Sequence, residues 1–224
     1  AAEQDRMRRR RIFDTLISLG PSIVDHATLL LQDSRWFVLR NMTALLRVVG
    51  DRTTLPQVRR LAQHADLRVR LEAIKSLFHL DAGVPRTLLD ELIASADPKE
   101  AEAAVDLVGN YGIAEGLEPL LALLEPRDLR GRHRSLRVKA LRALGELGDP
   151  AALDHLGRFF KITGLTLVNP EERRTAFESL AGYPWEARAP LVQRGLGARD
   201  PKSREACQRL AHEDTGAREQ AEAS

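Results

Sequence analysis

The chain has 224 residues, of which 43% are hydrophobic and 29% are charged, a balance that excludes a disordered polymer. Aromatic residues make up only 4%, so a core must be built from Leu, Ala, Val and Ile, which favours helices over strands. The net charge of +2 gives no argument for a polyanionic partner, and the single cysteine, Cys207, excludes an internal disulfide and a multi-cysteine metal site.

Small and apolar residues recur along the chain with the period of a helix. In the clearest copy, Val69 is followed by Ala73, Ser76 and Leu77, which form one stripe of an α-helix. The same spacing predicts seven first helices, whose first inward positions are separated by 30, 31, 31, 36, 36 and 31 residues. These positions are Arg8, Val38, Val69, Glu100, Leu136, Glu172 and Ser203.

A turn with Gly or Asp follows each of the first six predicted helices, and a second, shorter apolar helix follows the turn. An Asp or Asn then precedes the next unit, where its side chain is expected to cap the next first helix. The predicted caps are Asp33, Asp66, Asp97, Asn169 and Asp200. The second helices are predicted within residues 22–31, 53–62, 84–93, 116–124, 151–160 and 186–196.

Each unit is therefore a helical hairpin of about 31 residues that cannot bury both of its apolar stripes alone, whereas stacking of neighbouring hairpins buries them. The sequence predicts an all-α fold, a right-handed α-solenoid of about seven antiparallel hairpins. We expect a single domain over residues 1–212 and a polar tail over residues 213–224, which have no apolar stripe. Because the chain lacks an initiator Met, we expect it to be part of a longer protein.

Three segments carry a specific resemblance. The motif "SLRVKALRALGELGDPAAL" (residues 135–153) resembles the short bacterial HEAT repeats, the type also called phycobilisome-lyase-like, and residues 66–83 and 33–51 match the same pattern less completely. The resemblance spans roughly residues 6–212, although Arg8, Glu100 and Glu172 replace the apolar starting residue in the weaker copies. It implies a HEAT-like array and says little about function.

In such repeats an Asp of the turn commonly pairs with the Arg that follows the first inward position of the next unit. The resemblance therefore implies a ladder of charge pairs between neighbours, here Asp51–Arg70 and Asp149–Arg173. Exposed pairs of this kind contribute about 0–1 kcal/mol each, so the ladder is expected to define register more than stability.

The two longer intervals place extra residues in two loops, where repeat arrays often bind partners. The first loop carries Arg127, Arg130, Arg132 and Arg134, which either contact a phosphate or carboxylate or form a solvated loop with their acidic neighbours. The second loop contains Leu165 and Leu167, which either pack under their own hairpin or present an apolar surface to a partner.

No residue set points to catalysis. The six histidines are scattered without an HExxH motif, there is no phosphate-binding glycine loop, and Cys207 occupies a core position of the helical stripe. HEAT-like iron hydroxylases need several His-Glu pairs, and only His212–Glu213 is present. No cofactor or metal is expected, and Trp36 and Trp185 are interpreted as packing residues rather than as the base-binding residues of HEAT-like DNA glycosylases.

The leading interpretation is a non-enzymatic scaffold that binds an unidentified protein through the concave face of the array and its two long loops. The second helices supply mixed charges that suit a protein surface. The first alternative is nucleic-acid binding through Arg8–Arg11 and residues 127–134, although Arg8–Arg11 also suit a polar cap; the second is an accessory enzyme of the phycobilin-lyase type. Without a signal peptide or membrane segment in the sequence, we expect no membrane insertion and a cytoplasmic location. The candidate residues on the second helices are Arg59, Arg60, Arg86 and Arg158.

Overall fold

The computed structural model describes residues 2–125, 133–159, 169–198 and 200–222. Over these residues the protein contains α-helices and short 3-10 helices and no strand, which confirms the predicted all-α class. The helices pack in sequential pairs, as the predicted helical repeat array requires, and a final helix follows the sixth pair. They group into two compact units, Ala1–Leu88 and Leu89–Ser224, with the boundary inside helix α6.

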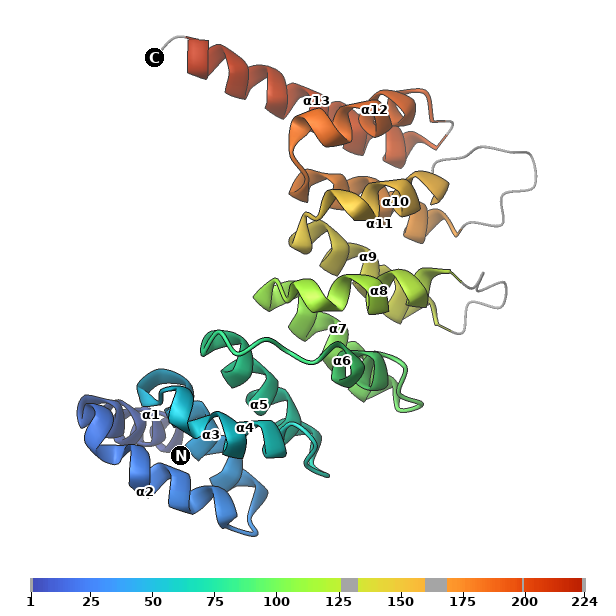
Figure 1. Cartoon of the computed structure of the whole chain (residues 1–224). Helices are drawn as coiled ribbons and strands as arrows, with labels where there is room; N and C mark the ends of the chain where they lie inside the picture. The colour runs from blue at the N-terminus through green and yellow to red at the C-terminus, as the bar shows by residue number, and fades with distance from the viewer. Residues whose placement is uncertain (1, 126–132, 160–168, 199, 223–224) are drawn as a thin grey trace. The chain divides into compact units, whose positions relative to one another are not determined.

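In the first unit, α3 packs against α5, while α2 packs against α3 and α4 packs against α5 (Figure 1). The shorter second helices thus cover the row of first helices, and α1 contacts α3 at one end of that row. The α-helices of this unit are α1 (Ala2–Ser18), α2 (Val24–Leu29), α3 (Trp36–Val49), α4 (Leu55–Leu61), α5 (Leu67–His79) and the start of α6 (Arg86–Ile93). The 3-10 helices are η1 (Gly20–Ile23), η2 (Leu30–Gln32) and η3 (Arg52–Thr54).

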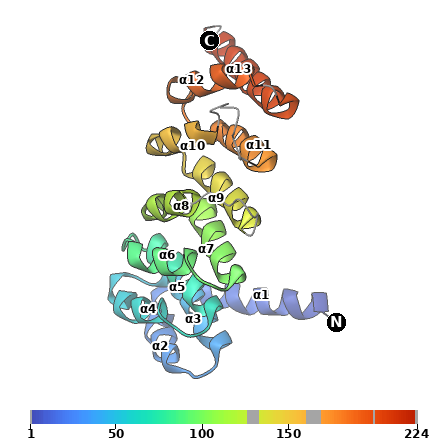
Figure 2. The same ribbon diagram turned by 90° about the vertical axis from the view of Figure 1, so that its right-hand side faces the viewer.

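In the second unit, the first helices α7, α9, α11 and α13 each pack against the next. Figure 2 shows the second helices α8, α10 and α12 together on one side of the first helices α9, α11 and α13. The α-helices are α7 (Pro98–Tyr111), α8 (Leu117–Leu124), α9 (Arg134–Leu147), α10 (Leu153–Phe159), α11 (Pro170–Ser179), α12 (Trp185–Leu196) and α13 (Pro201–Glu222). The 3-10 helices are η4 (Ala114–Gly116), η5 (Pro150–Ala152) and η6 (Leu180–Gly182).

Helix α13 continues as a helix through Glu222, into the segment for which the sequence predicts a polar tail. The single domain over residues 1–212 stays a prediction.

The predicted stripe forms the core of each unit. On α5, Val69, Ala73, Ser76 and Leu77 are completely buried. The predicted stripe is wrong at the N-terminus, where Arg8 is exposed. Burying a guanidinium without a partner costs free energy, so this side chain keeps its hydration.

Small residues let the first helices of the second unit approach closely. A Cβ atom added at Gly109 would lie 3.0 Å from Ala143, and one added at Gly145 would lie 2.8 Å from the Ser179 backbone. Glycine therefore stands at these positions because each neighbouring helix occupies the space of a side chain.

The predicted caps are largely confirmed. Asp66, Asp97 and Asn169 accept hydrogen bonds from the backbone N–H two residues later, at the starts of α5, α7 and α11. Asp200 accepts from the Ser203 N–H at the start of α13. Asp33 is an exception, since it accepts from the Arg35 N–H while Arg35 itself is the residue before α3.

Candidate partner-binding surfaces

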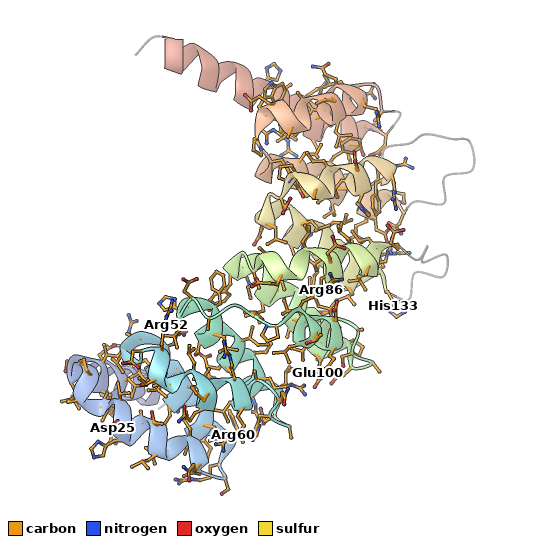
Figure 3. All side chains as sticks on the ribbon, viewed as in Figure 1. Asp25, Arg52, Arg60, Arg86, Glu100 and His133 are labelled. Carbon is orange, nitrogen blue, oxygen red and sulfur yellow. The ribbon has the colours of Figure 1, made fainter. Side chains whose placement is uncertain are left out.

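Two of the candidate arginines, Arg59 and Arg60 on α4, join their own hairpin to its neighbours. The Arg59 Nη2 donates to the Ala82 carbonyl at 3.2 Å, and the Arg60 Nη2 donates to the Leu31 carbonyl at 3.4 Å. Both residues remain exposed, and Arg60 is labelled in Figure 3. Each side chain therefore helps to hold adjacent hairpins together and still presents part of its guanidinium to solvent.

The structure describes only some of the candidate residues of the two long loops. Arg127, Arg130 and Arg132 of the first loop lie outside the described residues, as do Leu165 and Leu167 of the second. Arg134 is exposed in the first turn of α9, directly after His133, which is labelled in Figure 3. Arg86 is exposed at the start of α6. The contact of the loops with a partner stays a prediction.

Arg158 on α10 belongs to a small charged cluster with the end of α8. Its Nη1 donates to Glu125 Oε1 at 2.5 Å, and the His155 Nδ1 lies 3.0 Å from the same oxygen. Arg158 and Glu125 are more than half exposed, so the cluster is accessible and contributes little to stability. It lies between the segments that lead into the two long loops.

Arg137 on α9 and Glu172 on α11 form a buried ion pair that the sequence analysis does not predict. The Arg137 Nε donates to Glu172 Oε1 at 2.9 Å, and its Nη1 donates to the carbonyls of Leu123 and Leu124 at 3.1 and 3.2 Å. Both charged side chains are about 95% buried. A single guanidinium thus joins the end of α8, α9 and α11, so it fixes both ends of the first long loop.

The sequence does contain a signal for this pair, in the form of a departure from the repeat pattern. Glu172 replaces the apolar residue that starts the helical stripe, and an Arg follows the corresponding position of the preceding unit. A buried carboxylate needs an ionic or hydrogen-bonding partner, so the departure from the repeat pattern marked a pairing. A related but more exposed pair joins Arg47 on α3 to Glu72 on α5, with an Nε–Oε1 distance of 3.3 Å.

Helices α7 and α9 also share a surface charge cluster. The Lys139 Nζ lies 2.6 Å from Asp106 Oδ2 and 3.3 Å from Glu102 Oε2. The hydrogen bond to Asp106 raises the pKa of Lys139 above its ordinary value, against the opposing effect of desolvation. The observed charge pairs between neighbouring hairpins therefore include contacts between successive first helices.

The turn acids of the predicted ladder act as helix caps. Asp51 accepts from the Thr53 N–H at 2.8 Å, and Asp149 accepts from the Ala151 N–H at 2.9 Å, at the starts of η3 and η5. The hydrogen bonds from Thr53 lower the pKa of Asp51. The pairings of Asp51 with Arg70 and of Asp149 with Arg173 stay predictions.

Asp33 and Asp66 each hold the arginine two residues later. The Asp66 carboxylate accepts from the Arg68 Nε and Nη2 at 3.0 and 2.6 Å, and Asp33 accepts from the same two atoms of Arg35 at 2.9 and 2.7 Å. The side-chain hydrogen bonds from Arg35 and Arg68 lower the pKa of Asp33 and Asp66 to about 2. Both carboxylates therefore stay charged well into the acidic range.

Acid should consequently weaken the first unit through these two residues. Because the folded pKa lies below the value of 3.8 that the unfolded carboxyl has, the stabilisation is present above that value and is lost as the pH falls through about 2. We expect the urea midpoint of the unchanged chain to fall as the pH is lowered from 3.8 to about 2, and that of the double variant Asp33→Asn, Asp66→Asn to fall less. An equal fall of the urea midpoint in both proteins would show that these two carboxylates do not cause the loss of stability.

Cys207 lies in the core, as its position in the stripe predicts. It is completely buried, and a Cβ atom added at Gly195 would lie 2.2 Å from its Sγ, which shows how closely α12 approaches α13. Desolvation raises the pKa of the thiol to about 12.

The thiol should therefore be unreactive in the folded protein. We expect a disulfide reagent at pH 8 to modify native Cys207 about two to three orders of magnitude more slowly than the urea-unfolded chain, because the thiolate is the reactive form. A native rate equal to the unfolded rate would show that the α12–α13 contact opens readily.

Two other kinds of feature, a metal site and a membrane span, are absent from the described residues. Among the described residues, no group of three His, Cys, Asp or Glu side chains is arranged to hold a metal ion. Within the same part of the chain, no helix combines the length and the apolar composition that crossing a membrane requires.

Known proteins resemble the chain at the level of its repeats. No curated protein matches it. A solved structure described as an engineered protein of the Northeast Structural Genomics Consortium is similar with a TM-score of 0.43 and 18% identity, over 84% of this chain and 57% of that one. Over part of its length the sequence also matches a family model, which is described as HEAT repeats. The match covers residues 84–164, which include α6 to α10.

Proposed function

We propose that the chain is a non-enzymatic protein-binding scaffold that uses the exposed side of its second helices together with its two long loops. HEAT arrays commonly mediate protein binding, and the residues that match HEAT repeats include α6, α8 and α10, the first long loop and the start of the second. We also propose that the whole array is of the short bacterial type that residues 135–153 resemble.

The charge of the second helices is the observation that carries this proposal. Their exposed charged residues are balanced in sign, with five basic and five acidic side chains among the described residues. A phosphate backbone requires a surface with a positive excess, whereas a protein partner can match a mixed one. The basic residues are Arg59, Arg60, Arg86, Arg158 and Arg194, and the acidic residues are Asp25, Glu91, Glu118, Asp154 and Glu186.

Affinity purification from the source cell would test the proposal. The bait is the whole chain, compared with the variants Arg86→Glu and Arg158→Glu, and with Arg142→Glu as a control on the exposed side of a first helix. We expect specific partner proteins to bind the unchanged chain and the control, and to be lost in at least one of the two second-helix variants. Retention by all three variants would contradict the assigned surface.

A nucleic-acid titration would distinguish the scaffold function from the first alternative, nucleic-acid binding. Arg8, Arg10 and Arg11 are exposed on α1 and could contact phosphates. A phosphate-binding surface loses affinity steeply as the salt concentration rises, because bound counterions are released. Tight binding of mixed DNA or RNA with such a slope, abolished by changing these arginines to serine, would favour nucleic-acid binding over the scaffold.

A further inference from the structure

Two neighbouring aromatic side chains with an arginine on either side lie at the N-terminal ends of α3 and α5. The Arg68 Cζ lies 3.3 Å above the Trp36 ring centre, the Trp36 and Phe37 rings meet edge to face with centres 6.0 Å apart, and the Arg35 Cζ lies 5.5 Å from the Phe37 ring centre. We call these four residues, Arg35, Trp36, Phe37 and Arg68, the arginine–aromatic row.

The row is held in place before any ligand arrives. Asp33 and Asp66 each bind two nitrogen atoms of Arg35 or Arg68, so both guanidinium planes are fixed. Their Nη1 groups donate to no other atom in the part of the chain that the structure describes. Prepositioned side chains lose little conformational entropy on binding, which is a property of strong interface residues.

Apolar side chains extend the same surface. Phe37 is 46% exposed, and Leu29, at the end of α2, and Leu30, at the start of η2, are 67% and 44% exposed. Helix η2, which contains Leu30, packs against α3, the helix that begins with Trp36 and Phe37. Exposed Leu and Phe beside Arg and Trp form the composition that is enriched at the centres of protein interfaces.

The surrounding unit is basic. The first unit contains 15 basic and 9 acidic residues, whereas the second contains 19 basic and 23 acidic residues, so their net charges are +6 and −4. Among the described side chains of the first unit, ten basic and only four acidic residues are exposed. A ligand for this surface should therefore be acidic.

We propose that the arginine–aromatic row, with Leu29 and Leu30, binds an acidic segment of another protein that carries apolar side chains. Carboxylates of the segment bind the free Nη1 groups of Arg35 and Arg68, and an apolar side chain covers Phe37 and the two leucines. The proposal rests on the protein-binding function proposed above and adds a binding surface on the first unit, at the starts of α3 and α5 and the end of α2.

The composition favours a protein over nucleic acid at this position. The exposed Leu29 and Leu30 match the apolar side chains of a protein segment, whereas leucines do not stack on bases. A single-stranded RNA that stacked on Phe37 would be the competing ligand, and the experiment must distinguish it.

Selection of peptides by the whole chain would test the proposal. A random-peptide phage library is selected against the folded protein, and the strongest peptide is then synthesised and titrated. We expect a consensus of Asp or Glu with Leu, Ile, Phe or Trp. The variants Phe37→Ser and Arg35→Ser should each weaken binding of that peptide about tenfold, as loss of an interface anchor does.

Matched controls are available on the same helix and the following turn. Val48, at the other end of α3, is 47% exposed, and Arg52 is exposed in η3, so Val48→Ser and Arg52→Ser should leave the affinity unchanged. A consensus without acidic residues, no enriched peptide, or equal binding by Phe37→Ser would overturn the proposal. So would single-stranded RNA that binds with a steep salt dependence and is lost in Phe37→Ser.

Failure of this surface is distinguishable from failure of the scaffold function. If peptides or purified partners are lost on changing Arg86 or Arg158 but not Phe37, the chain binds proteins and only the arginine–aromatic row is wrongly assigned. If neither peptides nor cellular proteins bind the chain, both proposals fall.

Discussion

Replacing Glu172 by leucine is expected to lower the free energy of unfolding of the second unit by about 3–5 kcal/mol. The change leaves the Arg137 guanidinium buried without its carboxylate, and the carbonyls of Leu123 and Leu124 cannot neutralise its charge. Urea unfolding followed by circular dichroism measures the effect.

The double variant Arg137→Met, Glu172→Leu provides the informative control. It removes both charges and fills the space with apolar atoms, so it should recover most of the lost stability. A charge pair of similar geometry but greater exposure, tested by Lys139→Met, should cost only about 0–1 kcal/mol. Equal destabilisation by the single and double Arg137 and Glu172 variants would mean that shape, and not the unpaired charge, causes the loss.

Replacing Gly182 by alanine is expected to cost about 3 kcal/mol, at the upper end of the effect of overpacking. The added Cβ atom would lie 1.6 Å from the Gly145 carbonyl oxygen, which belongs to the backbone of α9 and cannot rotate away. The chain must therefore move η6 away from α9. Thermal unfolding of the variant measures the loss.

Gly157 is the matched control for this substitution. It is a buried glycine of α10, and among the described residues a Cβ atom there would meet only Leu191 Cδ2, at the ordinary contact distance of 3.4 Å. Gly157→Ala should be neutral or stabilise the helix by up to about 1 kcal/mol, because alanine is the better helix former. If both variants unfold at the same temperature, the close approach of η6 and α9 is not a constraint in solution.

Much of the repeat architecture could be predicted because its signals are local. The burial of Ala73 and Leu77 follows from the helical period of apolar residues, and the capping by Asp66 and Asp97 follows from their position before a helix. The recurrence of these signals about every 31 residues then predicts that similar hairpins pack side by side.

The candidate surfaces were less predictable, because a residue type does not say which neighbour it meets. Arg59 and Arg60 were predicted as partner-binding residues from their helix, yet each also donates to a carbonyl of an adjacent hairpin. Trp36 was interpreted as a packing residue, and its half-exposed place beneath Arg68 depends on how α3 and α5 approach each other.

The order of helices, their caps and their buried stripes are thus contained in the amino-acid sequence, since each depends on residues within a few turns of one another. The pairing of Arg137 with Glu172 and the stacking of Arg68 on Trp36 required the tertiary structure. Their partners lie 35 and 32 residues apart in the sequence. Only the packing of one hairpin on the next decides whether two such side chains come within a few ångströms, and hence whether a charge is buried in a pair or stacked on a ring at the surface.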